Sequence, residues 1–303
     1  MQTFPPTLSL RHTLLALAVT AVWGSNFVVI HYGLLHLPPL LLAALRFLCV
    51  FFPAVFFLKR PNVPWRNLAA YGVLVGAGQF GFLFLAMNGN ITPGLASLVV
   101  QTQVFFSIGL AMLLSGERVR MYQIAALLIT VAGLSIIMMH TDGSTTPLGL
   151  ALVLLAAAAW AGSNIVVRQA PVDSMVSYVV WASLFSAPPL FALSLVFEGW
   201  PAIRQGLIEA DAITWGTVLW QAVGNTMFGY AMWGSLLSRY PMATIAPLAL
   251  LVPVFGMGTA ALWIGEPLQD WKLIAASLVM AGLALNLLWP KVIARSARVV
   301  PNA

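Results

Sequence analysis

The chain has 303 residues, of which 61% are hydrophobic and only 7% are charged, and its net charge is +6. Soluble globular domains carry about 25% charged residues, so this composition excludes a water-soluble globule and indicates a membrane protein. The single cysteine, Cys49, excludes an internal disulfide, and no cysteine or histidine spacing indicates a metal or haem site. We therefore expect no cofactor.

Apolar runs of about 20 residues, the length a helix needs to cross the bilayer core, follow one another along the chain. Turn or charged residues separate most of them, and no connection is long enough to fold as a separate domain. We therefore expect an all-α membrane protein with ten transmembrane helices, at residues 13–32, 38–58, 68–88, 93–114, 121–139, 148–167, 174–197, 214–236, 242–263 and 271–289.

Lysine and arginine are divided unevenly between the two sides that these helices define. The termini and the loops after helices 2, 4, 6 and 8 hold Arg11, Lys59, Arg60, Arg66, Arg118, Arg120, Arg168, Arg239, Lys291, Arg295 and Arg298, whereas the other side holds only Arg204 and Lys272. The positive-inside rule then predicts that both termini are cytoplasmic. Because topology explains the basic charge, we expect the lipid bilayer, and not nucleic acid, as the partner.

Two short stretches occur twice along the chain. Ser25-Asn26-Phe27-Val28-Val29 in the first span returns as Ser163-Asn164-Ile165-Val166-Val167 in the sixth, 138 residues later. Gly116-Glu117 before the fifth span returns as Gly265-Glu266 before the tenth, 149 residues later. These echoes pair helices 1–5 with helices 6–10.

The pairing predicts one five-helix repeat over residues 1–140 and a second over residues 141–303, which ends in a short cytoplasmic tail. Because five is an odd number, the two copies cross the membrane in opposite directions and form an inverted repeat. Secondary transporters use this symmetry for alternating access around a site near the bilayer midplane. A transporter is therefore favoured, with a channel or a sensor as the alternative.

The order and spacing of several stretches resemble the EamA family of the drug/metabolite transporter superfamily. They are Trp23-Gly24-Ser25-Asn26-Phe27, Pro38-Pro39-Leu40-Leu41-Leu42-Ala43-Ala44-Leu45-Arg46-Phe47, Pro253-Val254-Phe255 and both Gly-Glu pairs, and the resemblance covers about residues 14–289. Within the family the chain most resembles the bacterial amino-acid exporters. The resemblance implies export of neutral amino acids and related metabolites across the inner membrane, with a broad exporter of drugs or amphipathic metabolites as the alternative.

Polar residues inside lipid-spanning helices are costly unless they face the bundle interior or a wet cavity. Amides lie at depth in helices 1, 3, 4, 6 and 8, and aromatic residues lie at similar depth. We expect a substrate cavity lined by Trp23, Asn26, Arg46, Gln79, Phe80, Gln101, Trp160, Asn164, Asn225, Tyr230 and Trp233. For each of them, interhelical hydrogen bonding or core packing is the alternative. Gln101 and Gln103 lie about 200° apart on a helix, so they cannot both face one cavity.

Arg46 is the charged residue that lies well inside a span. Snorkelling to the interface or bonding to carbonyls of a neighbouring helix is one interpretation. The other is a fixed positive charge that attracts a substrate carboxylate. No Asp, Glu or His lies mid-span, so the sequence offers no obvious proton relay and no catalytic acid or base. We expect weak or no coupling to protons, and no enzymatic activity.

Prolines interrupt several of the expected spans. Each one removes a backbone hydrogen bond and allows a kink, so we expect hinges at Pro53, Pro188, Pro247 and Pro253, with static kinks as the alternative.

Overall fold

The structure is a computed structural model that describes residues 8–115, 120–140, 144–170, 173–240 and 242–299, and in those residues it contains helices and turns but no strand. The recurring pair Gly116-Glu117 lies outside the described residues. The first five spans are α1 (Leu10–Gly33), α2 (Pro39–Phe51) with the short η1 (Ala54–Phe56), α3 (Trp65–Val73) with η2 (Leu74–Gly81) and α4 (Phe82–Met87), α5 (Pro93–Val99) with η3 (Val100–Thr102) and α6 (Gln103–Ser115), and α7 (Met121–Met139).

The second half of the chain repeats this order. Its spans are α8 (Pro147–Arg168), α9 (Met175–Ser183) with α10 (Ala187–Phe197), α12 (Ala212–Leu219) with η4 (Trp220–Phe228) and α13 (Gly229–Arg239), α14 (Met242–Ile245) with η5 (Ala246–Leu250) and α15 (Leu251–Ile264), and α16 (Asp270–Val299). Among the described residues, nine spans are long and apolar enough to cross a membrane. The helices α12, η4 and α13 together form one further span over residues 212–239, the eighth along the chain, and bring the number in the described residues to ten. Gln221 and Asn225 in its middle make this span more polar than the other nine.

Two details differ from the sequence-based expectation. The connection after the seventh span, expected to be a loop, forms the helix α11 (Gly199–Glu209), which exposes Trp200 and Ile208 beside polar residues. The helix that carries the tenth span, α16, extends beyond the end of that span at Trp289 and continues to Val299. A search for 20-residue apolar runs misses both features, since α11 is short and the end of α16 is basic.

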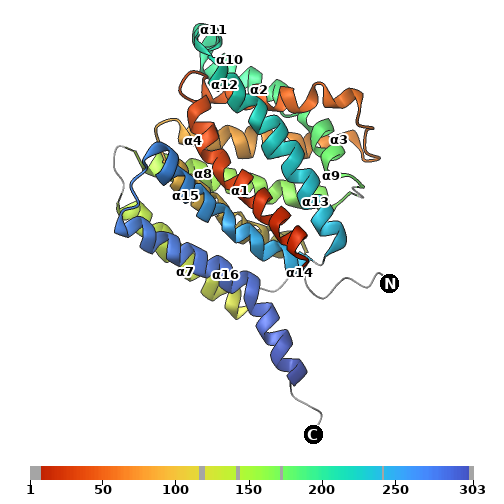
Figure 1. Cartoon of the computed structure of the whole chain (residues 1–303), viewed down its shortest axis with the longest axis vertical. Helices are drawn as coiled ribbons and strands as arrows, with labels where there is room; N and C mark the ends of the chain where they lie inside the picture. Colours follow the sequence, from red (N-terminus) through yellow and green to blue (C-terminus); the bar gives the residue numbers. More distant parts are fainter. Residues whose placement is uncertain (1–7, 116–119, 141–143, 171–172, 241, 300–303) are drawn as a thin grey trace.

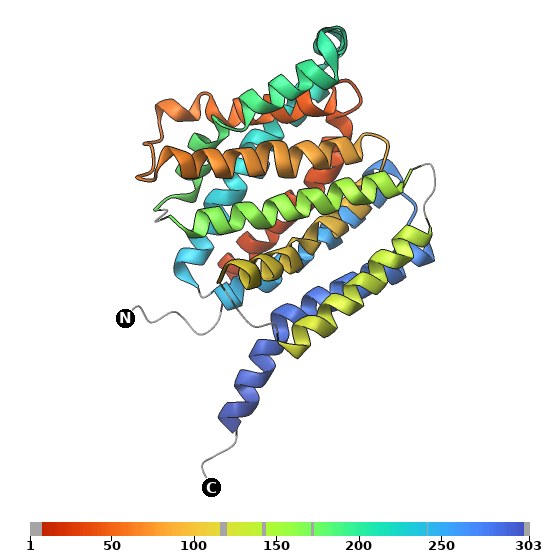
Figure 2. The ribbon, with the colours of Figure 1, turned by 180° about the vertical axis from the view of Figure 1, so that it is seen from behind.

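Helices of the two halves are interleaved. On η2, a Cβ atom added to Gly78 would lie 2.7 Å from the Cβ of Ala159, so the sixth span packs against the third. On α1, a Cβ atom added to Gly24 would lie 2.6 Å from the carbonyl oxygen of Val252, so the first span packs against the ninth. α7 and α16 lie side by side at one end of the molecule in both views (Figures 1 and 2).

The irregular segments occur at matching places in the two halves. η2 and η4 are π-helical, and they start at Leu74 and Trp220; η3 and η5 are 3-10 helices, and they start at Val100 and Ala246. Both pairs therefore start 146 residues apart, close to the offsets of the sequence echoes. π-helical segments inside α-helices are frequent at functional sites, and broken helices are typical of transporter binding sites.

The four prolines lie at breaks or helix ends. Pro53 follows the end of α2 and precedes η1, and Pro188 lies in the first turn of α10. Pro247 lies in η5, and Pro253 lies in the first turn of α15. Their action as hinges stays a prediction.

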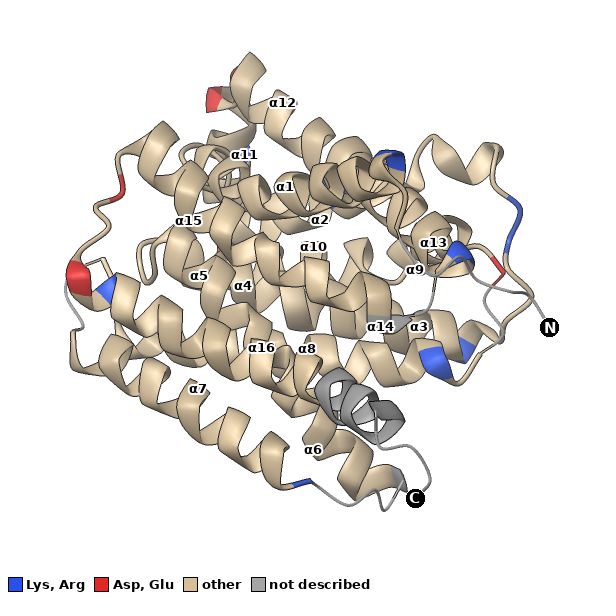
Figure 3. Cartoon of the chain, turned by 60° about the horizontal axis from the view of Figure 1, so that its bottom comes forward, with Lys and Arg blue, Asp and Glu red and all other residues tan. Residues whose placement is uncertain are grey.

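Charged residues lie mostly at the two ends of the bundle (Figure 3). At the acidic end, two carboxylates cap the starts of spans. Glu198 accepts hydrogen bonds from the backbone N–H groups of Leu40 (2.6 Å) and Leu41 (3.2 Å) at the start of α2. Glu266 accepts from the backbone N–H of Gly94 (2.9 Å) and the Thr92 hydroxyl (2.5 Å) at the start of α5. A carboxylate is favoured at a helix N-terminus because the N–H groups there have no partner within the helix.

Glu266 also holds α16 in place, since its Oε1 lies 3.1 Å from Nζ of Lys272 and both side chains are at most 5% exposed. Replacing Glu266 by Ala leaves the lysine buried without a partner, so we expect a loss of about 3 kcal/mol in the free energy of unfolding. The measurement is the thermal midpoint in detergent. The exposed Glu209, changed to Gln, is the control, and the double variant E266Q/K272M is expected to recover most of the loss. An unchanged thermal midpoint for E266A would show that the ion pair between Glu266 and Lys272 does not hold α16 in place.

Candidate functional site

Arg46 is buried in the middle of the bundle, with 1% of its surface exposed. Its Nη2 donates to the Thr226 hydroxyl (3.0 Å), and its Nη1 lies 3.5 Å from Oε1 of Gln221. Its Cζ atom lies 3.8 Å from the ring centroid of Phe80 and 5.0 Å from that of Phe47. We call Arg46, Phe47, Phe80, Gln221 and Thr226 the arginine cluster. Arg46 therefore does not snorkel to the interface; it is held by neutral groups.

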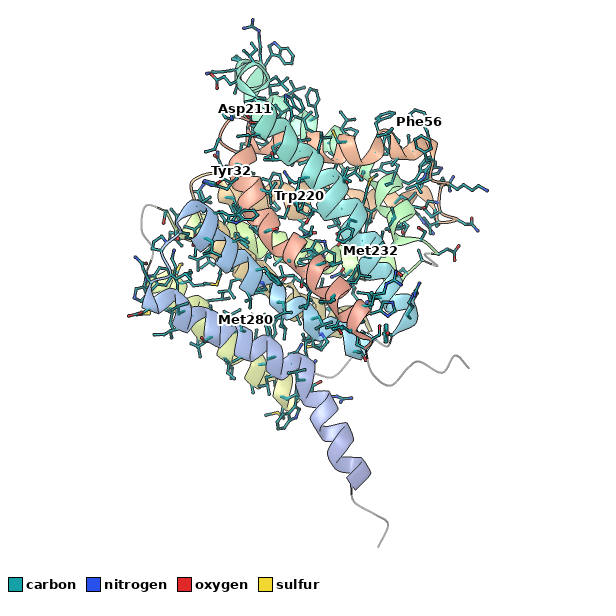
Figure 4. All side chains as sticks on the ribbon, viewed as in Figure 1. Tyr32, Phe56, Asp211, Trp220, Met232 and Met280 are labelled. Atoms are coloured by element: carbon teal, nitrogen blue, oxygen red, sulfur yellow. The ribbon has the colours of Figure 1, made fainter. Side chains whose placement is uncertain are left out.

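The arginine cluster brings the two π-helical segments together. Phe80 comes from η2, whereas Gln221 and Thr226 come from η4, which begins at Trp220 (Figure 4). The Thr226 hydroxyl accepts from Arg46 and donates to the carbonyl oxygen of Gln221, five residues earlier (2.9 Å). A spacing of five residues brings the two positions close on a π-helix but not on an α-helix. The local geometry of η4 thus allows both side chains to reach Arg46.

Among the residues that the structure describes, no acidic side chain pairs with Arg46. In the part of the chain that the structure describes, the one salt bridge joins Lys272 and Glu266 at the acidic end. The Nε of Arg46 and the Nε2 of Gln221 are both buried and have no hydrogen-bond partner. An unsatisfied buried donor costs about 1–3 kcal/mol, so the cluster retains two donors that an anionic ligand would satisfy.

Among the described residues three further amides, Asn26, Gln79 and Asn286, carry unsatisfied oxygens, and the first two lie in the spans around Arg46. Oδ1 of Asn26 on α1 and Oε1 of Gln79 on η2 are buried without a hydrogen-bond partner. Which end of each amide is oxygen is an assignment, but either end leaves a buried polar atom unpaired. In each side chain one buried polar atom thus lacks a hydrogen-bond partner.

An aromatic group lies deeper along α1. Nε1 of Trp23 donates to the backbone carbonyl of Asn225 (3.1 Å). The Trp23 ring centroid lies 6.0 Å from that of Tyr230 and 5.2 Å from that of Trp233. Trp23 also packs so close to Gly229 that a Cβ atom there would lie 2.3 Å from its Nε1. This group fixes the first span against the eighth.

The remaining predicted residues lie between other spans. Nε2 of Gln101 donates to the carbonyl of Ala249 in η5 (3.3 Å), while Nδ2 of Asn164 donates to Oε1 of Gln103 (3.2 Å). Trp160 is partly buried and packs against the main hydrophobic core. Gln101 and Gln103 thus reach different neighbours, and these contacts match the interhelical role that was the alternative for each.

The cavity predicted from the sequence did not include Gln221 and Thr226, which bind Arg46. It also did not include a series of contacts between the third and seventh spans. Tyr71 and Tyr178 pack edge to face with ring centroids 4.9 Å apart, and the Tyr178 hydroxyl donates to Oδ1 of Asn67 (2.6 Å). The sequence shows that amides and tyrosines lie inside the spans. The α-helical periodicity does not show which of these side chains lie close together in the folded bundle.

At the opposite end, Asp211 caps α12 (Figure 4). The backbone N–H and the hydroxyl of Thr214 donate to Oδ1 of Asp211 (2.8 and 2.7 Å) and lower the pKa of this carboxyl below its usual value. His36 lies with its Nδ1 2.9 Å from the same hydroxyl. This group joins the connection after α1 to the start of the eighth span.

Residues 10–139 and 147–288 match the EamA-like transporter family, and together they span most of the chain. The chain belongs to this family. The family resemblance, the all-helical fold and the transporter assignment made from the sequence are confirmed. This EamA-family transporter is a multi-pass membrane protein, and the two matched segments fall in the two halves that the sequence echoes define.

Two similar proteins carry the name "Probable amino-acid metabolite efflux pump". The one from Salmonella typhimurium is 43% identical over 96% of this chain and 99% of its own length, and the one from Escherichia coli is 40% identical over 94% and 99%. A "Probable terminal-alkyne amino-acid exporter" from Streptantibioticus cattleyicolor is 26% identical over 89% of this chain and 91% of its own. A solved crystal structure with 20% identity superposes with a TM-score of 0.61 over 93% of this chain and 98% of that one, and shares its fold.

The contact between Arg46 and Phe80 is testable in this EamA-family transporter by a double-mutant cycle. A desolvated cation over an aromatic face contributes up to about 2 kcal/mol, so we expect R46M and F80L to be coupled by 1–2 kcal/mol in the free energy of unfolding. Phe84 is buried beside Phe80 and has no contact with the guanidinium, so F84L is the matched control. Equal coupling of R46M to both phenylalanines contradicts a specific cation–π contact.

Proposed function

We propose that this transporter exports neutral amino acids and related metabolites from the cytoplasm across a bacterial inner membrane by alternating access. Both termini lie in the cytoplasm, and the protein acts as a carrier and not as an enzyme. The uneven division of lysine and arginine supports this orientation. The names of the two relatives at 43% and 40% identity support the substrate class and the direction.

The observation that carries the proposal is that Arg46 is buried, at 1% exposure, and pairs with no acidic side chain of the described residues. The charge of a guanidinium is costly to bury, and the neutral groups around Arg46 compensate it only in part, since its Nε has no partner. A carboxylate is the ligand that removes this cost, because it supplies both the opposite charge and acceptor oxygens. Amino acids carry such a carboxylate.

Broken helices support alternating access. η2 and η4 meet at Arg46, and η3 and η5 meet through the hydrogen bond from Gln101 to Ala249. Each pair joins one segment from each half, as in carriers that move one repeat against the other. The site residues that we propose are those that the sequence indicated, together with Gln221 and Thr226.

The second candidate is an exporter of cationic drugs. A fixed positive charge at the centre of the bundle disfavours it, because a cation placed beside Arg46 without an acidic group would be repelled at low dielectric. Amphipathic metabolites that carry a carboxylate remain within the proposal.

Uptake into proteoliposomes tests the function. We expect saturable uptake of neutral amino acids from a panel of cysteine, threonine, methionine and phenylalanine, with little response to a pH gradient. R46Q removes a charge-assisted contact of about 1.5–3 kcal/mol and is expected to weaken apparent affinity about 10- to 100-fold. The control is R60Q, since Arg60 also stacks on an aromatic ring, Trp65 (4.2 Å), but at a helix end.

Three outcomes contradict the proposal. They are uptake of a cationic drug alone, uptake that requires a proton gradient, and full activity of R46Q at normal expression.

A further inference from the structure

We infer that the bundle holds a subsite for a zwitterion, in which Arg46 and Gln221 bind the carboxylate of the substrate and Asn26 and Gln79 bind its ammonium group. This inference rests on the proposed function and specifies its substrate class. Molecules that carry both groups on one carbon are recognised, whereas those that carry only one of them are recognised poorly.

The carboxylate side consists of two neighbouring unpaired donors. Nη1 of Arg46 lies 3.5 Å from Oε1 of Gln221, so the two side chains are adjacent. The Nε of Arg46 and the Nε2 of Gln221 have no partner and are buried. Two donors and one positive charge match the two oxygens of a carboxylate. The contacts to Thr226 and Phe80 hold the guanidinium in place.

The ammonium side consists of two amides that each have one unpaired end, and an ammonium ligand requires that end to be the oxygen. Asn26 and Gln79 are 3% and 6% exposed, and Oδ1 of the first and Oε1 of the second have no partner. An ammonium group is a donor in three directions, so it needs acceptors. Neutral amides meet this need without a carboxylate, which would pair with Arg46 and remove the charge that the substrate requires.

Packing contacts place Asn26 near the carboxylate side. A Cβ atom added to Gly33 would lie 2.8 Å from both Leu42 and Thr217, so α1, α2 and α12 meet there. Asn26 lies seven residues before Gly33 and therefore on the same face of α1, two turns further in.

On the other two helices of this junction, the next residues inward are those of the arginine cluster. Arg46 lies four residues after Leu42, and Gln221 lies four residues after Thr217. The hydrogen bond from Trp23 to the carbonyl of Asn225 fixes the deeper layer. Asn26 lies one turn after Trp23, and Gln221 lies four residues before Asn225. Both therefore lie between the junction at Gly33 and the contact of Trp23 with Asn225.

Gln79 approaches from the third span. Its neighbour Phe80 faces Arg46, and its other neighbour Gly78 faces Ala159 on the sixth span. The side chain of Gln79 thus lies on the part of η2 between the arginine cluster and α8. It is also the sixth residue of η2, as Asn225 is the sixth residue of η4, so the two π-helical segments carry amides at matching positions.

Competition for uptake in proteoliposomes tests the subsite. Unlabelled competitors are the transported amino acid, its methyl ester, which lacks the carboxylate, and its 2-hydroxy analogue, which lacks the ammonium group. Loss of either charged contact corresponds to about 1.5–3 kcal/mol, so we expect each analogue to compete about 10- to 100-fold more weakly.

Two variants separate the two sides. Q221E places a carboxylate beside Arg46, which forms an ion pair that keeps the fold but blocks the carboxylate subsite; it is expected to lower affinity for the amino acid at least about tenfold. N26L is expected to reduce the preference for the amino acid over the 2-hydroxy analogue by about the same factor. Asn286 on α16 also has a buried oxygen without a partner, so N286L is the matched control and leaves both ratios unchanged.

The outcomes are distinguishable. If the wild-type protein transports no amino acid at all, the proposed function and the subsite both fail. If it transports amino acids, but the ester and the 2-hydroxy analogue compete as well as the parent compound, the function stands and the subsite is overturned. Changes in the ratios that are equal for N26L and N286L also overturn it.

Discussion

The buried guanidinium of Arg46 joins spans from both halves of the chain. Arg46 lies where three spans meet, and its guanidinium is held by a threonine hydroxyl, the side-chain oxygen of a glutamine and two phenylalanine rings. In the described part of the chain no acidic side chain pairs with it. Such an arrangement costs free energy compared with an apolar residue, because neutral dipoles only partly replace water. The cost is understandable if the charge serves a ligand and not the stability of the bundle. The position of this cluster between two π-helical segments links it to the parts of the fold that differ from regular helix.

These irregular segments give the two halves a common mechanical design. Each half contributes one π-helical segment followed by a 3-10 segment in its next span. η3 contacts η5 through Gln101 and Ala249, and Arg46 contacts both η2 and η4. The first and sixth spans pack against helices of the opposite half. Any movement of one half relative to the other therefore changes these contacts. Close glycine contacts hold neighbouring spans together, both in regular helix at Gly24 and in the π-helical η2 at Gly78.

Sequence reasoning identified the spans and placed Arg46 well inside one of them, because hydropathy and the position of a charge within a span are local properties; it left open whether the guanidinium snorkels to the interface. It left Gln221 and Thr226 out of the site. On an α-helix these residues, five apart, point in directions about 140° apart; only the π-helical form of η4 brings both to Arg46. It also did not show that Gln101 and Asn164 bond to neighbouring helices, since such pairing depends on which spans touch. The sequence did not predict the helix α11, because its 11 residues are too few for a search based on the length of a membrane span.

A structure of the transporter with a bound amino acid tests the central claim most directly, because it locates the carboxylate without relying on rates. The account predicts that the carboxylate oxygens lie within about 3 Å of Nε of Arg46 and Nε2 of Gln221, with the ammonium group towards Asn26 and Gln79. A ligand bound elsewhere in the bundle, with Arg46 still held only by Thr226, Gln221 and the phenylalanine rings, would show that the buried arginine is a structural element and not the substrate site.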